Sequence, residues 1–245
     1  MDNTLLVSLS HQLASYRAMD VIANNIANLS TPAYKREEVQ FKEYVEQLPT
    51  VEGQNGPQTL TFVQDAGVLR DTSEGQLKRT DAPYDLAING KGYFEIQTAN
   101  GPRYTRNGHF ALDAQGRLVT ADGNPVMGDG GELTITPDDG DIHIAADGTV
   151  SGKQGQLGKL KVVDFADESA MTKEGASLYA TTQTAQPIET PNIEQGTIET
   201  SNVQPVVEIS HMLEVLRAYQ ATANLTQTQE DMMRQAIDKL GSVPG

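Results

Sequence analysis

The sequence contains no cysteine and no tryptophan, and aromatic residues make up only 5% of its 245 residues. The absence of cysteine excludes disulfides, thiolate zinc sites and cysteine nucleophiles. Hydrophobic residues account for 38% of the chain, which is below the share typical of globular domains. The chain can therefore build only a modest core, and we expect neighbouring subunits to supply part of its stability.

Positive charge is also scarce, with 18 lysines and arginines against 33 acidic residues and a net charge of −15. Contacts to nucleic-acid phosphates and to anionic membranes need clustered basic residues, so neither partner is expected. No apolar run approaches the roughly 18 residues of a membrane span, which argues against membrane insertion. The opening MDNTLLVSLS lacks the basic start and continuous apolar core of a Sec signal. We therefore expect no Sec-dependent export.

Glycine is missing from both ends of the chain. None occurs in residues 1–52 or between Gly196 and Gly241, and 20 of the 22 glycines fall from Gly53 to Gly196. Glycine destabilises helix interiors and favours turns. This distribution predicts helices at the two ends, and strands and turns in the middle.

The first predicted helix covers residues 4–28, where apolar residues recur at steps of three and four. Its expected inward face consists of Leu6, Leu9, Leu13, Tyr16 and Ile26. Pro32 disfavours helical geometry at the preceding residue, so the helix should end near Asn28. Three asparagines, Asn24, Asn25 and Asn28, are poor residues for a helix interior. We interpret them as a specific polar contact with the backbone or a neighbouring chain, and a frayed last turn is the alternative.

The second predicted helix carries a heptad pattern of apolar residues over about four heptads, as in coiled coils. Its apolar positions are Ile209, Met212, Leu216, Tyr219, Met233, Ile237 and Leu240, interrupted by Ala223, Thr226 and Glu230. An amphipathic helix packed on its own domain is the alternative. We expect the two terminal helices to pair as a coiled-coil module and their remaining apolar faces to meet other subunits.

The middle of the chain predicts an inserted all-β domain. Residues 86–88 and 93–97 are strand-like, and Asn100-Gly101, Asn107-Gly108, Asp122-Gly123 and Asp147-Gly148 are dipeptides typical of hairpin turns. Short strands about ten residues apart favour an antiparallel sandwich or barrel. Residues 46–75 are predicted to be an extended linker with a hairpin, such as 59–63 against 67–70. Residues 186–200 should return the chain in extended form.

The predicted fold is therefore α+β and discontinuous. Its expected parts are the paired terminal helices of residues 1–35 plus 196–245, the extended linker and hairpin region of 36–75, and the β domain of 76–195.

No motif predicts catalysis or cofactor binding. The GKGYFE at 90–95 lacks the third glycine of a dinucleotide fingerprint, and the GQLGK at 155–159 lacks the Walker spacing. The DDGD at 138–141 lacks the alternating ladder of a calcium loop and is more typical of a turn. The four histidines are scattered without the spacing of a metal site. We therefore predict no catalytic, cofactor-binding or metal-binding residues.

Three stretches resemble one family. Residues 23–37 (ANNIANLSTPAYKRE) are similar to the N-terminal signature of bacterial flagellar rod and hook proteins, and residues 201–233 (SNVQPVVEISHMLEVLRAYQATANLTQTQEDMM) are similar to the C-terminal one. Residues 85–128 resemble the family's β region. The opening MDN, the length and the PYDLAI element resemble the proximal rod proteins most, with the distal rod proteins as the nearest rival. The chain departs from the family pattern at Ala33, where glycine is usual, and at Gln204, where Asn or Asp is usual.

The resemblance implies a non-enzymatic axial subunit of the flagellar basal-body rod, which crosses the periplasm. The terminal helices would polymerise with copies and with other proximal and distal rod subunits into the shaft that carries motor torque to the hook. Such subunits leave the cell through the flagellar type III export apparatus, which fits the missing Sec signal. The implied assembly interface comprises the apolar helix positions named above together with Asn24, Asn25 and Asn28.

Two other classes of function stay open on the sequence alone. A secreted β-domain adhesin that oligomerises through its helices would form a closed oligomer. An enzyme with its site in the β domain would need a pocket with convergent polar groups, for which the sequence gives no sign.

Overall fold

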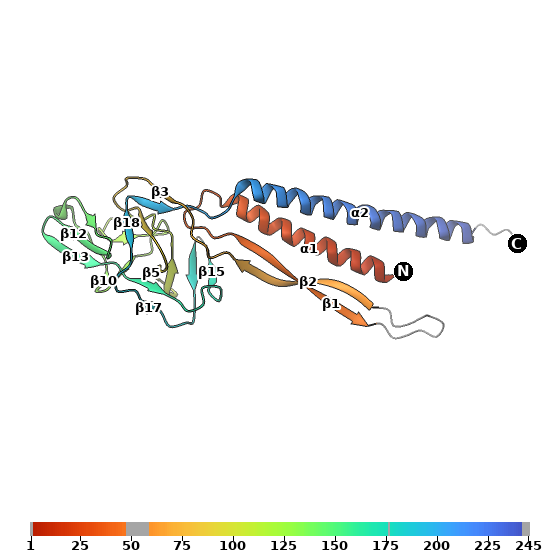
Figure 1. Ribbon diagram of the computed structural model, residues 1–245, viewed down its shortest axis with the longest axis horizontal. Coiled ribbons are helices and arrows are strands. Elements are labelled where there is room, and N and C mark those ends of the chain that lie inside the picture. Colours follow the sequence, from red (N-terminus) through yellow and green to blue (C-terminus); the bar gives the residue numbers. More distant parts are fainter. Residues whose placement is uncertain (1, 48–58, 176, 242–245) are drawn as a thin grey trace. The chain divides into compact units, whose positions relative to one another are not determined.

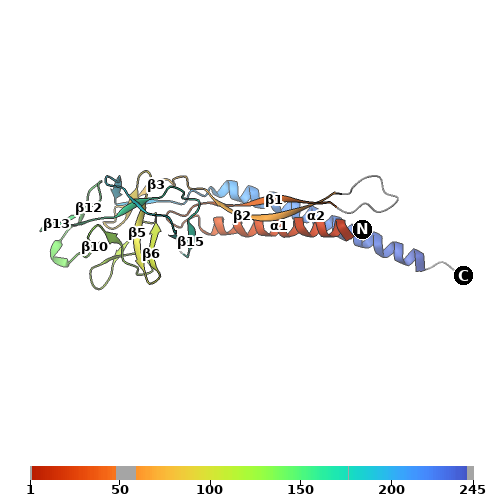
Figure 2. The same ribbon diagram turned by 90° about the horizontal axis from the view of Figure 1, so that it is seen from below.

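The structure, a computed structural model, describes residues 2–47, 59–175 and 177–241. Its chain divides into two compact units (Figures 1 and 2). Unit 1 comprises residues 1–27, 37–71 and 204–245, and unit 2 comprises residues 28–36 and 72–203. Both terminal helices thus belong to the same unit although nearly the whole sequence separates them.

Unit 1 consists of two helices and one pair of strands. Its elements are α1 (Asp2–Ala27), β1 (Glu37–Gln47), β2 (Thr59–Arg70) and α2 (Pro205–Gly241). Helix α1 contacts α2 and both strands, and both views show α1 and α2 side by side (Figures 1 and 2). Helix α2 begins at Pro205, where the missing amide hydrogen has no intrahelical partner to lose. The two predicted terminal helices are therefore present and in contact.

The strands of unit 1 differ from the predicted linker. Strand β1 pairs along its length with β2 in antiparallel register, from Glu37 opposite Arg70 to Gln47 opposite Thr59. The expected hairpin of 59–63 against 67–70 is wrong, because both segments lie in the single strand β2. An isolated two-stranded sheet is marginally stable in water, and here α1 packs against it. The predicted linker residues 48–58 lie outside the described part of the chain.

Unit 2 contains the remaining strands. They are β3 (Leu77–Arg79), β4 (Leu86–Ile88), β5 (Tyr93–Thr98), β6 (Gly101–Thr105), β7 (Ala111–Leu112), β8 (Leu118–Val119), β9 (Met127–Gly128), β10 (Gly131–Glu132), β11 (His143–Ile144), β12 (Thr149–Gly152), β13 (Gly155–Lys159), β14 (Val162–Asp164), β15 (Thr172–Glu174), β16 (Leu178–Ala180), β17 (Gln186–Pro187), β18 (Ile193–Gln195) and β19 (Thr197–Glu199), with a 3-10 turn η1 (Pro137–Asp139). Six of them form one sheet in the order β15-β16-β6-β5-β14-β17, and the others form a three-stranded sheet and two-stranded pairs.

The six-stranded sheet separates two hydrophobic clusters. Phe94 belongs to the larger cluster and its neighbour Tyr93 to the smaller one, and the same holds for Val162 and Val163 on the adjacent strand. Successive side chains of a strand point to opposite faces, so the two clusters cover the two faces of the sheet. All strand pairings reported within this sheet are antiparallel.

The predicted antiparallel β domain is present, but it is not a closed barrel. The six-stranded sheet has β15 and β17 at its two ends, and no pairing joins them in the described residues. Asn100-Gly101 does form a hairpin, between β5 and β6, with Gly101 at a positive φ of 98°. Asn107-Gly108 does not form the predicted hairpin turn. A Cβ on Gly108 would lie 1.7 Å from the Leu86 carbonyl oxygen, so glycine there allows two backbone segments to approach.

The connection that follows α1 keeps a left-handed residue where the family pattern has glycine. Ala33 has a φ of 55° and is 1% exposed. An L-residue in this region costs about 1–2 kcal/mol. The Ala33 amide donates to the Glu199 carbonyl at 2.9 Å, and this bond and the buried methyl group offset part of that cost. Ala33 therefore retains the left-handed turn despite the substitution.

The division into units differs from the expected boundaries. Residues 196–203 were expected in the helical module but group with unit 2. The reason is strand pairing, because β19 lies antiparallel to β3. Residues 37–71 group with the helices instead of forming a separate linker.

Candidate assembly surface and buried polar sites

The predicted inward face of α1 is exposed to solvent in the single chain. Leu6, Leu9, Leu13 and Tyr16 are 51%, 47%, 62% and 61% exposed. The covered residues of α1 include the small Ala14, Ser15 and Ala18 and the larger Leu5 and Met19, all half-buried, and then the buried Val21 and Ile22 near its end. These four residues are therefore not buried within the single chain, their expected role in an assembly interface stays a prediction, and Ile26 of the same set is half-buried.

The apolar positions predicted on α2 lie in two different environments. Met212, Tyr219 and Met233 are half-buried, whereas Ile209, Leu216 and Ile237 are 51%, 37% and 67% exposed. The side chain of Leu240 lies outside the described residues. Five further large exposed apolar residues of this helix were not predicted: Val206, Val207, Leu213, Leu225 and Met232. Val206 and Leu213 continue the three-and-four spacing of Ile209 and Leu216, so their spacing could have identified them.

The two helices differ in length, which explains the exposure at the end of α2. Helix α1 has 26 residues and α2 has 37, so at about 1.5 Å per residue α2 is longer by roughly 16 Å. Its C-terminal part extends past the N-terminus of α1 (Figure 1). A groove of 420 Å³ lies between Ser8 of α1 and residues of α2 that include Leu225, Met232 and Met233. The distal part of α2 therefore presents apolar side chains that α1 is too short to cover.

One of the three predicted asparagines forms a buried three-way contact inside unit 1. Asn25 is fully buried, and its amide nitrogen donates to the Glu37 carbonyl at 2.7 Å and to the Glu208 carboxylate at 3.1 Å. Its amide oxygen accepts from the Glu37 backbone at 3.0 Å. The side chain thus joins the end of α1 to the start of β1 and the first turn of α2. The expectation of a specific polar contact is confirmed for this residue.

The other two asparagines lie elsewhere. Asn24 is exposed, and Asn28 is half-buried in unit 2. The Asn28 carbonyl and side-chain oxygens accept from the backbone and hydroxyl of Thr31, each at 3.1 Å. These bonds close the turn that ends the helical segment, so Asn28 has a local role.

Replacing Asn25 with alanine should weaken unit 1. The change removes three hydrogen bonds of Asn25, two with the Glu37 backbone and one with the Glu208 carboxylate, and a hydrogen bond contributes about 0.5–1.5 kcal/mol net. We expect the free energy of unfolding of Asn25→Ala to fall by at least that amount in chemical denaturation. The exposed Asp20→Ala on the same helix is the control and should stay within about 0.5 kcal/mol of the unsubstituted protein. Equal stabilities of the two variants would contradict the role of Asn25.

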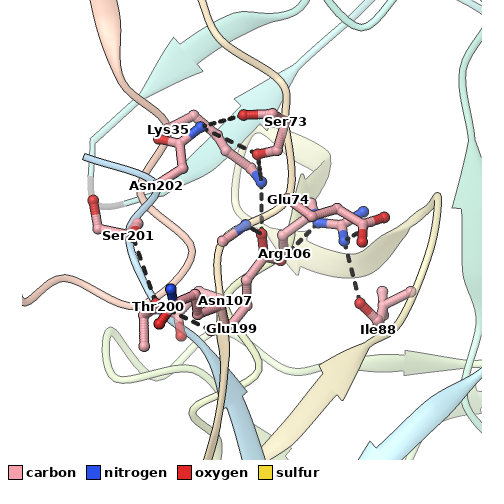
Figure 3. A network of polar contacts seen from close by, with 12 residues as sticks. Lys35, Ser73, Glu74, Ile88, Arg106, Asn107, Glu199, Thr200, Ser201 and Asn202 are labelled. Atoms are coloured by element: carbon pink, nitrogen blue, oxygen red, sulfur yellow. Dashed lines mark hydrogen bonds and ion pairs between the residues drawn. The ribbon is translucent and has the colours of Figure 1, made fainter. Parts of the chain in front are cut away.

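A second buried polar site lies in unit 2 and was not predicted. Glu199, at the end of β19, accepts from Lys35 at 2.6 Å and from the Arg106 Nε at 2.8 Å (Figure 3). The three side chains are 1%, 3% and 5% exposed. We call Lys35, Arg106 and Glu199 the Glu199 cluster. A buried charge needs pairing and hydrogen bonds to be tolerated, and here one carboxylate serves two cations.

Backbone groups complete the Glu199 cluster. Arg106 donates to the Gly92 carbonyl at 3.0 Å and to the Ile88 carbonyl at 3.2 Å. Lys35 donates to the Ser73 carbonyl at 2.7 Å, and the Gly75 amide donates to Glu199 at 2.9 Å. The exposed carboxylate of Glu74 lies 3.9 Å from Arg106. The cluster has two cations and one buried anion, and the exposed Glu74 carboxylate partly compensates the remaining positive charge.

Burial and charge act in opposite directions on the Glu199 carboxyl. Burial raises its pKa, but the positive charges of Arg106 and Lys35 and their hydrogen bonds outweigh burial and hold the pKa below the usual 4.5. Burial lowers the pKa of Lys35 from the usual 10.5, and the attraction of Glu199 offsets only part of this effect. Glu199 therefore stays ionised to more acidic pH in the folded chain than in the unfolded one.

This difference predicts a stability change in acid. Because the unfolded carboxyl binds a proton at higher pH than the folded one, unfolding takes up a proton and is favoured as the pH falls below about 4.5. The contribution is complete above that pH and is lost as the pH falls through the folded pKa. The difference in unfolding free energy between the unsubstituted protein and Glu199→Gln should therefore shrink in acid. Chemical denaturation between pH 7 and pH 3 measures it, and a constant difference would contradict the coupling.

Unit 2 also holds a polar pair and a groove outside the Glu199 cluster. Asp85 lies 2.7 Å from His109 and accepts from Thr80 at 2.6 Å, an arrangement that orients a surface histidine. Within the described ranges, no three His, Asp or Glu side chains are grouped so that they could hold a metal ion. A groove of 310 Å³ lined by loops around Asp113 and Pro137 lies in unit 2. Neither of the two helices that the structure describes is long and apolar enough to cross a membrane.

Three known sequence families match successive parts of the chain. Residues 5–35 match the flagella basal body rod protein family, residues 87–152 match the flagellar hook protein FlgE/F/G D1 domain, and residues 194–239 match the C-terminal region of flagellar basal body rod FlgEFG proteins. The first and third matches fall on segments that contain the two terminal helices, and the second falls in the β-rich unit.

Curated relatives match the chain along almost its whole length. The flagellar basal-body rod protein FlgF of Caulobacter vibrioides is 41% identical over 246 residues, which cover 99% of this chain and all of the relative. FlgF of Rhizobium meliloti is 32% identical, with 98% and 99% of the two chains covered. FlgG of Bacillus subtilis is 33% identical, with 90% and 92% covered. With identity at this level across the helical and β segments alike, the chain belongs to the family of flagellar basal-body rod proteins.

Proposed function

We propose that the chain is an axial structural subunit of the flagellar rod. It would polymerise through its terminal helices with copies of itself and with other rod proteins. The observation that carries this proposal is the set of large apolar side chains left exposed on both helices, from Leu6 to Tyr16 on α1 and from Val206 to Leu216 on α2. Exposed apolar surface of this extent is typical of interaction sites. Heterologous contacts that do not close generate an open helical array.

The coiled-coil pairing of α1 and α2 belongs to this proposal. Helix α2 keeps Met212, Tyr219 and Met233 half-buried at seven- and fourteen-residue intervals, which is the period of one heptad position. The exposed apolar residues lie on other sides of the same helices. Each helix would thus use one stripe inside the chain and a second stripe against neighbouring subunits.

The proximal rod is the position we favour within the flagellum. Full-length similarity to proteins named FlgF supports it, and the similarity to FlgG proteins makes the distal rod the second candidate. In either position the subunit would help carry torque from the motor to the hook. We further propose that it reaches the rod through the flagellar type III export apparatus and takes no part in catalysis.

Deletion and complementation test this function. A strain without the gene should lack flagella beyond the inner part of the basal body, and the restored chain should be found in purified basal bodies. The adhesin alternative instead requires a closed oligomer of fixed size in solution and flagella that form without the protein. Normal flagella in the deletion strain would contradict the proposal.

A further inference from the structure

Three segments connect unit 2 to the rest of the chain, and all three contribute to the Glu199 cluster or its immediate partners. Residues 28–36 follow α1 and supply Lys35. Residues 72–76 follow β2 and supply the Ser73 carbonyl and the Gly75 amide. Residues 199–203 precede α2 and supply Glu199 itself. Every covalent path between the two units therefore passes through this site.

Backbone and amide bonds tie the same segments to one another. The Asn202 amide donates to the Tyr34 carbonyl at 3.3 Å, and the Asn202 side chain accepts from the Arg36 backbone at 2.7 Å. That side chain also donates to the Ser73 carbonyl at 3.1 Å. The Thr200 amide donates to the Gln76 carbonyl at 2.8 Å. Each segment is thus bonded directly to the other two.

Arg106 anchors the site to the body of the β-rich unit. It belongs to none of the three segments and directly follows β6 in the sequence. Its guanidinium donates to Glu199 and to the Ile88 carbonyl (Figure 3), and it also donates to the Gly92 carbonyl. Those carbonyls lie at the end of β4 and just before β5. Glu199 therefore links the connecting segments to the sheet that carries the core.

We propose that the Glu199 cluster is the mechanical coupling of this subunit, which makes the three connecting segments carry force together. The proposal rests on the proposed function as a torque-carrying subunit and deepens it by naming the residues through which force enters unit 2. Glu199 is a positioning residue in this account. It is 1% exposed in the chain and acts by fixing the segments relative to one another.

The arrangement suits this role for two physical reasons. The short pair of β3 with β19 would open one hydrogen bond at a time if a single segment were pulled, whereas the bonds that Lys35, Gly75 and Arg106 donate to the Glu199 carboxylate are loaded in parallel. The cluster is also nearly dry, and attraction between charges is stronger in a low dielectric than at the surface. Separating any cation from Glu199 would leave a buried charge unpaired.

Rotation under load tests the proposal in cells that carry the full-length chain as their only copy. The variant is Glu199→Gln, which keeps the shape of the side chain and removes its charge. The control is Val150→Ala or Leu160→Ala, two fully buried core positions of unit 2, whichever matches the fall in melting temperature of Glu199→Gln. Motor speed is recorded for tethered cells in media of increasing viscosity, together with the amount of the chain in purified basal bodies.

We expect Glu199→Gln to enter rods and to rotate normally at low load, but to lose at least half of its speed or to break at high load, while the control of equal stability does not. Equal behaviour of variant and control at every load would overturn the proposal. If Glu199→Gln is missing from rods, Asn202→Ala takes its place, because that change removes ties between segments without unpairing a buried charge, and its result decides in the same way. Failure of the proposed function would instead appear as normal flagella in the deletion strain.

Discussion

Replacing Leu13 with aspartate is expected to abolish incorporation of the chain into rods while leaving the free subunit folded. Leu13 is 62% exposed in the chain, and substitutions at exposed positions usually change stability by about 0.5 kcal/mol or less. In an assembled shaft the same position would be covered by a neighbouring subunit. Burying an unpaired charge there costs several kcal/mol at every subunit contact, which is enough to stop polymerisation.

Two controls separate the apolar contact from other effects of Leu13→Asp. Leu13→Met keeps an apolar side chain of similar volume and should assemble. Gln154→Glu adds the same charge at an exposed polar position of unit 2 and should also assemble. Thermal unfolding of the purified proteins and their amounts in isolated basal bodies provide the two readouts. Normal basal bodies containing Leu13→Asp would show that this side of α1 is not an interface.

Replacing Glu199 with glutamine should cost about 3–5 kcal/mol of unfolding free energy, because removing one partner of a buried ion pair leaves uncompensated charge behind. Two cations depend on this carboxylate, and all three side chains are nearly inaccessible to solvent. The loss should appear in the transition of unit 2 during chemical denaturation.

The control for this prediction is an ion pair at the surface of the same unit. Glu174 is 46% exposed and pairs with Arg103 at 2.6 Å. Exposed pairs contribute about 0–1 kcal/mol, so Glu174→Gln should change stability by no more than that. If Glu199→Gln and Glu174→Gln lowered the free energy of unfolding by similar amounts, burial would not determine how much the Glu199 cluster contributes to stability.

The glycine distribution predicted the helices well and one strand badly. The absence of glycine correctly indicated helices near residues 4–28 and after residue 201, which the structure places at Asp2–Ala27 and Pro205–Gly241. Strand β1 also lies in the glycine-free region. Low glycine content permits a helix but also permits a strand, and the partner of β1 begins only at Thr59. Whether such a segment forms a helix or a strand depends on its pairing with a distant strand.

The orientation of α1 could not be read from residue size. The three-and-four spacing of the apolar residues predicts which of them share a face of α1, but not whether that face meets the same chain or a neighbouring subunit. In this chain Ala14 and Ala18 lie on the covered face, where small side chains allow elements to approach closely, and Leu13 and Tyr16 lie outside. Large apolar residues that lie outside in the single chain reverse the usual rule, and one sequence does not say whether another chain covers them.

The Glu199 cluster could not be predicted from local sequence patterns, for a different reason. Lys35 and Glu199 are separated by 164 positions, and Arg106 and Glu199 by 93. Each charge taken alone is indistinguishable from the other exposed charges of an acidic chain. Only the folded arrangement of β3, β4 and β19 brings them together. The polar contact of Asn25 was predicted because three asparagines within five residues beside a helix end are locally unusual.

Cysteine labelling at Leu13 tests the central claim most directly, since the chain has no other cysteine. The variant Leu13→Cys is treated with a maleimide as the free subunit and again in isolated basal bodies. If neighbouring subunits cover the exposed side of α1, the free subunit is labelled fast and the assembled one is protected at least tenfold. Equal labelling rates in the two states would contradict the account.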